Sequence, residues 1–143
     1  MLSGRHNPKL DEKGRLIFPA KLREDFAGGV VLARGQERCI NVYSAEEWAN
    51  LRNRMAQASN SSATVRALTR HMFAESELET FDGQGRILIA APLREWAGLD
   101  KELVVVGVLD HVEIWDRQAY ESYMASTAEL FASLDQEVIP GIN

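Results

Sequence analysis

The chain has 143 residues, of which 45% are hydrophobic and 26% are charged, and its formal net charge is −5. These proportions are those of an ordinary globular protein, so they exclude a wholly disordered chain and a fibrous one. The single cysteine, Cys39, excludes an internal disulfide and a Cys-x-x-Cys pair, and a reducing, cytoplasmic setting fits it best. No stretch approaches the ~18 uninterrupted apolar residues of a membrane span, and no apolar leader is present, so we expect a soluble protein that is not exported.

Residues 8–43 predict short strands, tight turns and one short helix. Gly14 supplies the positive φ that a tight turn requires, and the apolar run that follows it has the length of a strand. Pro19 suits the first position of a helix, and the pair Gly28-Gly29 ends it. The expected elements are an extended segment at 8–10, strands at 15–18, 30–33 and 39–43, and a helix from 19 to 26.

The next segment predicts two helices joined by a linker. Ser44 and Glu47 form a capping box, in which the serine oxygen accepts a helix N–H and the glutamate reaches back. Apolar side chains then recur at helical spacing, so a helix begins there. Alanine, serine and asparagine dominate residues 56–63, which therefore form a linker, and a second helix from residue 65 joins the two halves of the chain.

Residues 72–143 predict the same order of elements a second time. Pro92 begins a short helix that Gly98 ends, and Asp116 is a candidate N-cap for a C-terminal helix. Residues 135–143 are expected to be a frayed tail. The other expected elements are an extended segment at 78–81 and strands at 86–89, 103–108 and 112–115.

The two halves are related by an internal repeat. Asp11–Glu24 aligns with Asp82–Glu95 at an offset of 71, and seven of the fourteen positions are identical, including the pattern Asp-x-x-Gly-Arg at the tip of a predicted hairpin. The chain is therefore a tandem duplication, with one unit at 1–71 and another at 72–143. Each unit has few short strands for its many large apolar side chains. We therefore expect swapped or shared barrels and a protein that is not a monomer.

Charge is distributed unevenly along the chain. Residues 1–38 carry +3, residues 39–74 carry +2 and residues 75–143 carry −10. A basic first part and an acidic last part can mark a polyanion-binding face balanced by an acidic one. The alternative, an ordinary mixed surface, stays open on charge alone.

Three segments resemble the MraZ family of bacterial transcriptional regulators. They are Leu10–Arg23, Asp82–Ile87 and Val112–Asp116, and the resemblance extends from Lys9 to Tyr123. It implies an α+β fold of two tandem AbrB-like units, which are swapped-hairpin barrels, with connecting and C-terminal helices. It also implies a ring-shaped homo-oligomer, usually an octamer, that binds short direct repeats in the promoter of the division and cell-wall gene cluster.

The function implied by this resemblance is that of a sequence-specific DNA-binding regulator that generally represses the cluster, including its own promoter. Its partners are then double-stranded DNA and further copies of itself, with no membrane, and it lies in the cytoplasm in association with the nucleoid. The alternative from another class is a structural ring or protein-interaction module whose tips serve assembly rather than DNA. We expect no enzyme, cofactor or metal site, because no catalytic set, nucleotide loop or metal-ligand spacing is present.

Basic residues gather at the first tip. Lys13 and Arg15 are the principal candidates for DNA contact, with Lys9 beside them and Arg5 close in sequence. Lysine provides a mobile point charge for phosphates, whereas the planar guanidinium of arginine can also hold guanine O6 and N7 bidentately. The second tip keeps Arg86 but has no lysine and follows three glutamates, so it should bind DNA more weakly.

Four residues of the two tips are expected to shape the turns: Asp11, Gly14, Asp82 and Gly85. The glycines adopt positive φ at low conformational cost. An alternative interpretation of the arginines is that Arg15 and Arg86 only brace the turns by pairing with the aspartates. This alternative stays open, above all for Arg86.

Overall fold

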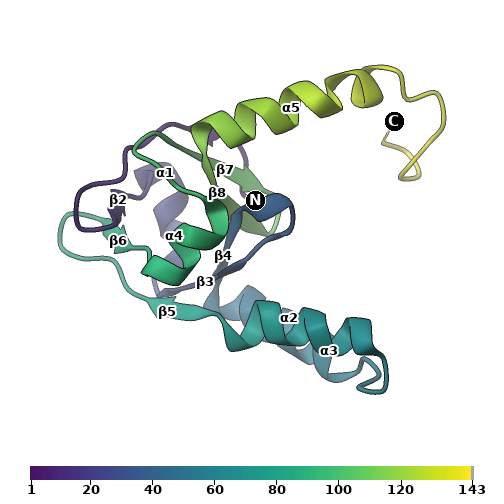
Figure 1. The fold of residues 1–143 in the computed structure, drawn as a ribbon, viewed down its shortest axis with the longest axis horizontal. Helices are drawn as coiled ribbons and strands as arrows, with labels where there is room; N and C mark the ends of the chain where they lie inside the picture. Colours follow the sequence, from purple (N-terminus) through teal and green to yellow (C-terminus); the bar gives the residue numbers. More distant parts are fainter. Residues whose placement is uncertain (143) are drawn as a thin grey trace.

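Two antiparallel sheets form the centre of the molecule (Figure 1). The computed structural model describes residues 1–142. The larger sheet has six strands in the order β1-β7-β8-β4-β3-β5, and the smaller one consists of β2 and β6. The strands are β1 (Arg5–His6), β2 (Arg15–Ile17), β3 (Val30–Arg34), β4 (Ile40–Ser44), β5 (Glu77–Glu79), β6 (Arg86–Leu88), β7 (Leu103–Val108) and β8 (His111–Asp116).

The helices begin and end close to the positions that the sequence predicts. Ser44 Oγ accepts a hydrogen bond from the Glu47 N–H at 3.1 Å, and Asp116 Oδ2 accepts one from the Ala119 N–H at 3.3 Å, so both N-caps are confirmed. Gly98 has a φ of 57° and ends α4 in the left-handed conformation. The helices are α1 (Ala20–Arg23), α2 (Ala45–Ala56), α3 (Ala63–Thr69), α4 (Ala91–Ala97) and α5 (Arg117–Ala132), with short 3₁₀ segments η1 (Glu24–Phe26) and η2 (Gln36–Arg38) and a π-helical segment η3 (Arg70–Ala74).

The predicted hairpin around each Asp-x-x-Gly-Arg tip is wrong, because neither β2 nor β6 pairs with the segment before its own tip. Such a hairpin would pair β2 with residues 8–10, but β2 pairs with β6 of the other repeat, with Leu16 opposite Ile87. Residues 8–10 run instead beside the segment before β7, where the Leu10 N–H donates to the Lys101 carbonyl at 2.8 Å. The pairing of β2 with β6 is favoured because Leu16 and Ile87, each 1% exposed, bury their side chains in one shared core. It agrees with the swapped-hairpin fold that the family resemblance implies.

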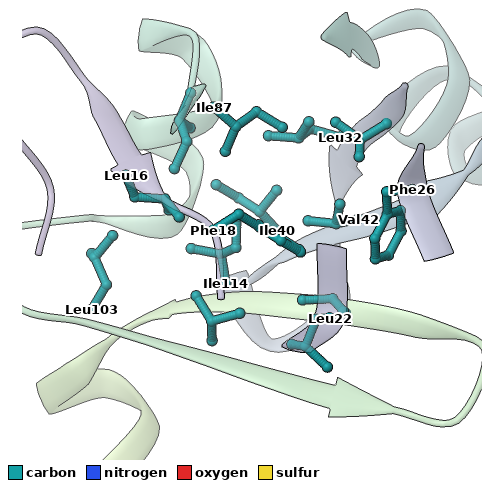
Figure 2. Close-up of a cluster of buried hydrophobic side chains, with 14 of the residues drawn as sticks. Leu16, Phe18, Leu22, Phe26, Leu32, Ile40, Val42, Ile87, Leu103 and Ile114 are labelled. Atoms are coloured by element: carbon teal, nitrogen blue, oxygen red, sulfur yellow. The ribbon is translucent and has the colours of Figure 1, made fainter. Parts of the chain in front are cut away.

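The two repeats are interleaved in the large sheet as well. β1 of the first repeat pairs with β7 of the second, β5 of the second pairs with β3 of the first, and β4 pairs with β8. The main hydrophobic core therefore combines side chains from both repeats (Figure 2). Its most deeply buried members include Leu16, Phe18, Leu32, Ile40, Ile87, Ile89, Leu93 and Ile114. Because the sharing takes place within one chain, burial of this core does not by itself require a second copy.

A smaller apolar cluster lies against the other face of β7. Tyr120 and Tyr123 of α5 pack on Trp115, with ring centroids 5.5 Å and 5.3 Å away. This contact attaches the first half of α5 to the sheet. The buried members of the cluster are Cys39, Val104, Val106 and Trp115.

Two helical arms extend from the sheets in Figure 1. α5 continues past the edge of the large sheet, and α2 and α3 form a second arm, called here the basic arm (residues 45–74), which diverges from α5. β2 and β6 lie at the opposite end of the molecule from the free ends of both arms. The surface around β2 and β6 is therefore remote from the free ends of α5 and of the basic arm.

The remaining expectations concern the connecting segments. α2 ends at Ala56 and α3 begins at Ala63, so the predicted linker between two helices is confirmed. Residues 135–142 belong to no helix or strand, and Asn143, the last residue of the expected frayed tail, lies outside the described residues. None of the helices formed by residues 1–142 has the length and the apolar content that crossing a bilayer requires.

Candidate nucleic-acid interface

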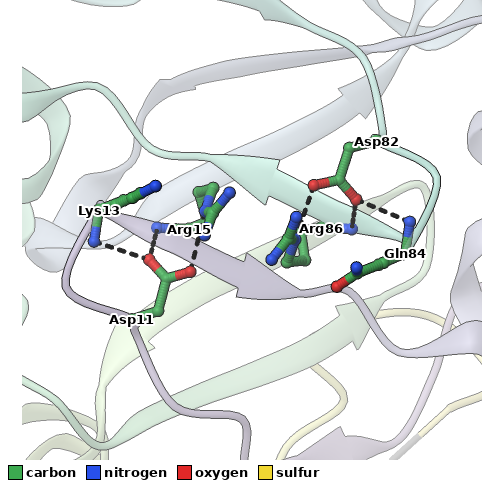
Figure 3. Close-up of polar contacts among 6 residues, drawn as sticks. All are labelled: Asp11, Lys13, Arg15, Asp82, Gln84 and Arg86. Atoms are coloured by element: carbon green, nitrogen blue, oxygen red, sulfur yellow. Dashed lines mark hydrogen bonds and ion pairs between the residues drawn. The ribbon is translucent and has the colours of Figure 1, made fainter.

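The first Asp-x-x-Gly-Arg tip is a turn closed by an aspartate side chain (Figure 3). Asp11 Oδ1 accepts hydrogen bonds from the backbone N–H groups of Lys13 and Arg15, each at 2.9 Å. Its second oxygen, Oδ2, accepts a hydrogen bond from Arg15 Nε, also at 2.9 Å. One carboxylate thus fixes both the path of the backbone and the direction of the arginine side chain.

The second tip repeats this arrangement atom for atom (Figure 3). Asp82 Oδ1 accepts hydrogen bonds from the Gln84 and Arg86 N–H groups, each at 2.9 Å, and Oδ2 accepts one from Arg86 Nε at 2.7 Å. The bracing that the sequence left open as an alternative for the arginines is therefore present in both tips. Bracing uses only Nε, and within residues 1–142 the Nη atoms of Arg15 and Arg86 have no hydrogen-bond partner. The outer edge of each guanidinium remains available.

These hydrogen bonds change the acidity of the aspartates. The pKa of Asp82 is lowered from 3.8 to about 2. The largest cause is the hydrogen bond from the Arg86 N–H; desolvation raises the pKa, whereas the Arg86 side chain and the Gln84 N–H lower it further. The N–H of Arg15 lowers the pKa of Asp11 in the same way, again against desolvation. Both carboxylates are charged at neutral pH, and each one pairs with the arginine of its own tip.

An NMR titration of the Asp82 carboxyl carbon tests this geometry. Because the pKa is depressed in the folded state, the stabilisation from the charged carboxylate is present above pH 3.8 and is lost as the pH falls from 3.8 to about 2. We expect Asp82 to be still ionised at about pH 3 in the wild type. In Arg86→Ala its pKa should rise part of the way towards 3.8, because the two backbone N–H donors remain. The matched control, Arg15→Ala, should leave the pKa of Asp82 unchanged, and an ordinary titration of Asp82 in the wild type would contradict the hydrogen-bond pattern.

An arginine of the other repeat lies close to the glycine of each tip. Gly14 has a φ of 80°, and a Cβ there would lie 2.2 Å from Arg94 Nη1; Gly85 has a φ of 75°, and a Cβ there would lie 2.3 Å from Arg23 Cζ. Arg23 Nη2 also donates a hydrogen bond to the Phe18 carbonyl at 2.7 Å. Sequence reasoning gave these two arginines no role. The sequence does contain a signal for them, because both repeats have an arginine at this position.

Substitution of the tip glycines should destabilise the fold through both effects. In Gly85→Ala the positive φ alone costs roughly 1 to 2 kcal/mol, and Arg23 must also move away from the new methyl group. The matched control is Gly83→Ala in the same turn, where a Cβ meets nothing within 4 Å and the change should stay within about 0.5 kcal/mol. Thermal unfolding followed by circular dichroism should give a Tm several degrees lower for Gly85→Ala only. Equal Tm values for the two variants would contradict the close approach of Arg23.

The pairing of β2 with β6 brings both tip arginines to one surface. Arg15 lies opposite Leu88, and Ile17 lies opposite Arg86. Side chains alternate between the two faces of a strand, so these four residues share the outward face, called here the ribbon face. The ribbon face therefore carries one braced arginine from each repeat, with side chains 27% exposed for Arg15 and 26% for Arg86.

The structure places the other basic candidates differently. Lys13 lies in the first turn, exposed, and Lys9 lies just before it, with Nζ 3.8 Å from Glu102 Oε1 and a side chain that is 65% exposed. Arg5 forms an ion pair with Glu121 of α5, so the structure does not bring it to the tip. Within residues 1–142 no group of histidine, cysteine and carboxylate side chains could hold a metal ion. The basic residues assembled at the tip are suited to phosphates and base edges.

A known protein family matches both halves of the chain. The family model described as "MraZ protein, putative antitoxin-like" matches residues 1–71 and again residues 72–139, so each match contains one tip. The chain belongs to the MraZ family. The structure of this MraZ chain thus combines both family repeats in a single interleaved fold, and the boundary between the two matches falls within η3.

Curated MraZ relatives cover the whole chain. A protein named transcriptional regulator MraZ from Salinispora tropica is 45% identical over 142 residues, which are 99% of this chain and 100% of the relative. Proteins of the same name from Saccharopolyspora erythraea and Clavibacter michiganensis are 43% and 46% identical over 142 residues, with 99% of each chain covered. Their shared name describes regulators of transcription.

Proposed function

We propose that this chain is a sequence-specific DNA-binding transcriptional regulator. In this proposal it represses the division and cell-wall gene cluster, including its own promoter, and binds direct repeats there as a ring-shaped oligomer. The observation that carries the proposal is the ribbon face, on which two aspartate-braced arginines from different repeats lie side by side (Figure 3). A protein with this activity acts in the cytoplasm, in association with the nucleoid.

The ribbon face offers hydrogen-bond donors of the kind that read DNA. The major groove admits a two-stranded β-ribbon, and an arginine can hold guanine O6 and N7 there with two parallel hydrogen bonds. Asp11 holds Arg15 through Nε, so the Nη groups are fixed in direction before DNA binds and lose less freedom on binding. Lys13 and Lys9 supply mobile charges for the flanking phosphates.

The two tips should contribute unequally to affinity. Both arginines have the same geometry, so the difference lies in their surroundings. The first tip has Lys13 where the second has Gln84, and residues 75–79 before the second tip include three glutamates. Like charge repels phosphate, which favours binding through the first tip, with Arg86 as the weaker contact.

The ring assembly is supported by the two arms. Beyond its contact with Trp115, α5 exposes apolar side chains that nothing in residues 1–142 covers, with Leu130 67% and Phe131 77% exposed. Residues 118–142 carry only acidic charges, whereas residues 48–74 carry four arginines and no acid. A groove of about 1050 Å³ lies along α3, between the basic arm and the sheet, with Leu68 and Met72 among its lining residues. Docking α5 of one copy on the basic arm of the next is a head-to-tail contact, which closes into a ring when the rotation permits.

Loss of the apolar contact on α5 should dissociate the oligomer. For Phe131→Ser we expect light scattering to give a smaller particle than for the wild type, because burial of a phenylalanine contributes roughly 1.5 to 3 kcal/mol at each subunit contact. The control is Leu78→Ser on β5, where the side chain is 73% exposed and belongs to neither arm; it should leave the particle unchanged. A wild-type particle of 16.0 kDa at micromolar concentration would contradict assembly altogether.

A second candidate function, a structural ring whose tips serve assembly, is favoured by one observation. Ile17 and Leu88 are exposed beside the arginines and could contact another protein surface. A gel shift separates the two candidates. We expect a complex with the DNA upstream of the gene and not with a shuffled duplex of equal length and composition. No complex with either duplex, from a protein that forms a stable oligomer, would favour the structural ring.

A further inference from the structure

The ribbon face contains two apolar side chains as well as two arginines. Ile17 is 59% exposed and Leu88 is 41% exposed, whereas Leu16 and Ile87 on the inward face are each 1% exposed. The ribbon therefore has apolar residues on both faces, although only one face is needed for the core. Large aliphatic side chains at the outermost strands of a protein expose apolar surface to water unless a partner covers them.

Charge identifies the class of partner for this face. Each exposed aliphatic residue lies directly across the ribbon from a braced arginine, Leu88 from Arg15 and Ile17 from Arg86. The aspartate carboxylates of the tips already accept hydrogen bonds from backbone N–H groups and from the arginine Nε atoms. On this surface cationic and aliphatic side chains alternate. Its matching partner is a polyanion that presents both hydrogen-bond acceptors and apolar groups. The major groove of DNA has this composition, because guanine presents acceptors and thymine presents its C5-methyl group.

We propose that Ile17 and Leu88 contact thymine methyl groups beside the guanines that Arg15 and Arg86 hold. This inference rests on the proposed DNA-binding function and assigns to it a second element of sequence specificity. Directly opposed residues in an antiparallel pair have Cβ atoms roughly 4.5 to 5.5 Å apart, which is between one and two base-pair steps of 3.4 Å. Each arginine and the aliphatic residue opposite it therefore read base pairs one or two steps apart, and each such pair of residues combines both repeats.

The proposal is tested by removing the methyl groups from the DNA. The upstream fragment is amplified with dTTP or with dUTP, which gives two duplexes that differ only in the thymine methyl groups. We expect wild-type affinity to fall about four-fold for each contacted methyl group that is lost, since burial of one such group is worth about 0.8 kcal/mol. The double variant Ile17→Ser/Leu88→Ser should bind the thymine duplex more weakly than the wild type does and should not distinguish the two duplexes.

Two controls make the outcomes distinct. Val108→Ser, at an aliphatic residue 37% exposed on β7, should keep the wild-type preference for thymine, and light scattering should show the same particle for all variants. Equal wild-type affinity for both duplexes overturns the methyl contacts while leaving DNA binding intact. Dissociation of the oligomer in the double variant also overturns them, because the ribbon face is then a contact between copies. Wild-type protein that binds neither duplex contradicts the proposed function itself.

Discussion

Replacement of Arg15 with alanine should reduce specific DNA affinity by about 5- to 150-fold for each tip engaged, while the protein stays folded. The reason is that a bidentate arginine–guanine contact contributes roughly 1 to 3 kcal/mol, and the proposed ring would present several copies of Arg15 to one DNA molecule. The change also leaves the Asp11 carboxylate without its arginine, near the DNA phosphates. Arg86→Ala should have a smaller effect, because its tip has the same geometry and fewer cations.

Two control variants identify the cause of that loss. Arg15→Lys keeps the positive charge but has neither the planar guanidinium nor the Nε atom that Asp11 fixes. Its affinity for DNA should therefore lie between those of the wild type and Arg15→Ala. Arg117→Ala removes an arginine that pairs with Glu102 near β7 and should retain specific binding. Fluorescence anisotropy with the upstream duplex measures the affinities, and circular dichroism checks the fold. Equal affinity of wild type and Arg15→Ala would show that the first tip is not a DNA contact.

Features that depend on neighbouring residues could be predicted from the sequence. The N-caps at Ser44 and Asp116 and the helix end at Gly98 follow from local hydrogen bonding and backbone freedom, and the structure places them as expected. The repeat predicted that both halves contain the same turn, and the two tips do have the same hydrogen bonds. The resemblance to a family then supplied the swapped fold.

Contacts between residues that are far apart in the sequence could not be predicted from local sequence patterns. The choice between residues 8–10 and β6 as the partner of β2 depends on which pairing buries Leu16, and either partner satisfies the local pattern. The same limit explains Arg5, which is close to the tip in sequence but is held by Glu121 from the far end of the chain. It also explains Arg23 and Arg94, because each of them lies close to the tip glycine of the other repeat, far away in the sequence.

If the protein binds DNA as the proposed ring, its affinity should rise steeply with the number of recognised boxes in the duplex. A single first tip offers only a few useful cations, Lys9, Lys13 and Arg15, so one contact is weak at physiological salt. Once one subunit is bound, its neighbours act on the adjacent boxes at an effective concentration that can reach millimolar, which raises affinity by roughly 10² to 10⁴ without a new type of contact. Each phosphate that is neutralised adds about −0.9 to the slope of log affinity against log salt, so the salt slope should steepen together with affinity. Residues 118–142 carry only acidic charges, and the free end of α5 lies at the opposite end of the molecule from β2 and β6, so these acidic residues disfavour DNA there and favour binding on the side of the tips.

A titration with duplexes of equal length that carry one, two, three or four boxes, at several salt concentrations, measures both quantities. The matched control is Phe131→Ser, in which the tips are unchanged but the contact between copies is weakened. We expect this variant to bind a single box as the wild type does and to lose the increase with box number. If the wild type binds one box as tightly as four, with the same salt slope, the subunits do not act together on DNA. The repeated boxes would then have to serve independent molecules, because a multivalent ring cannot leave both the affinity and the number of neutralised phosphates unchanged.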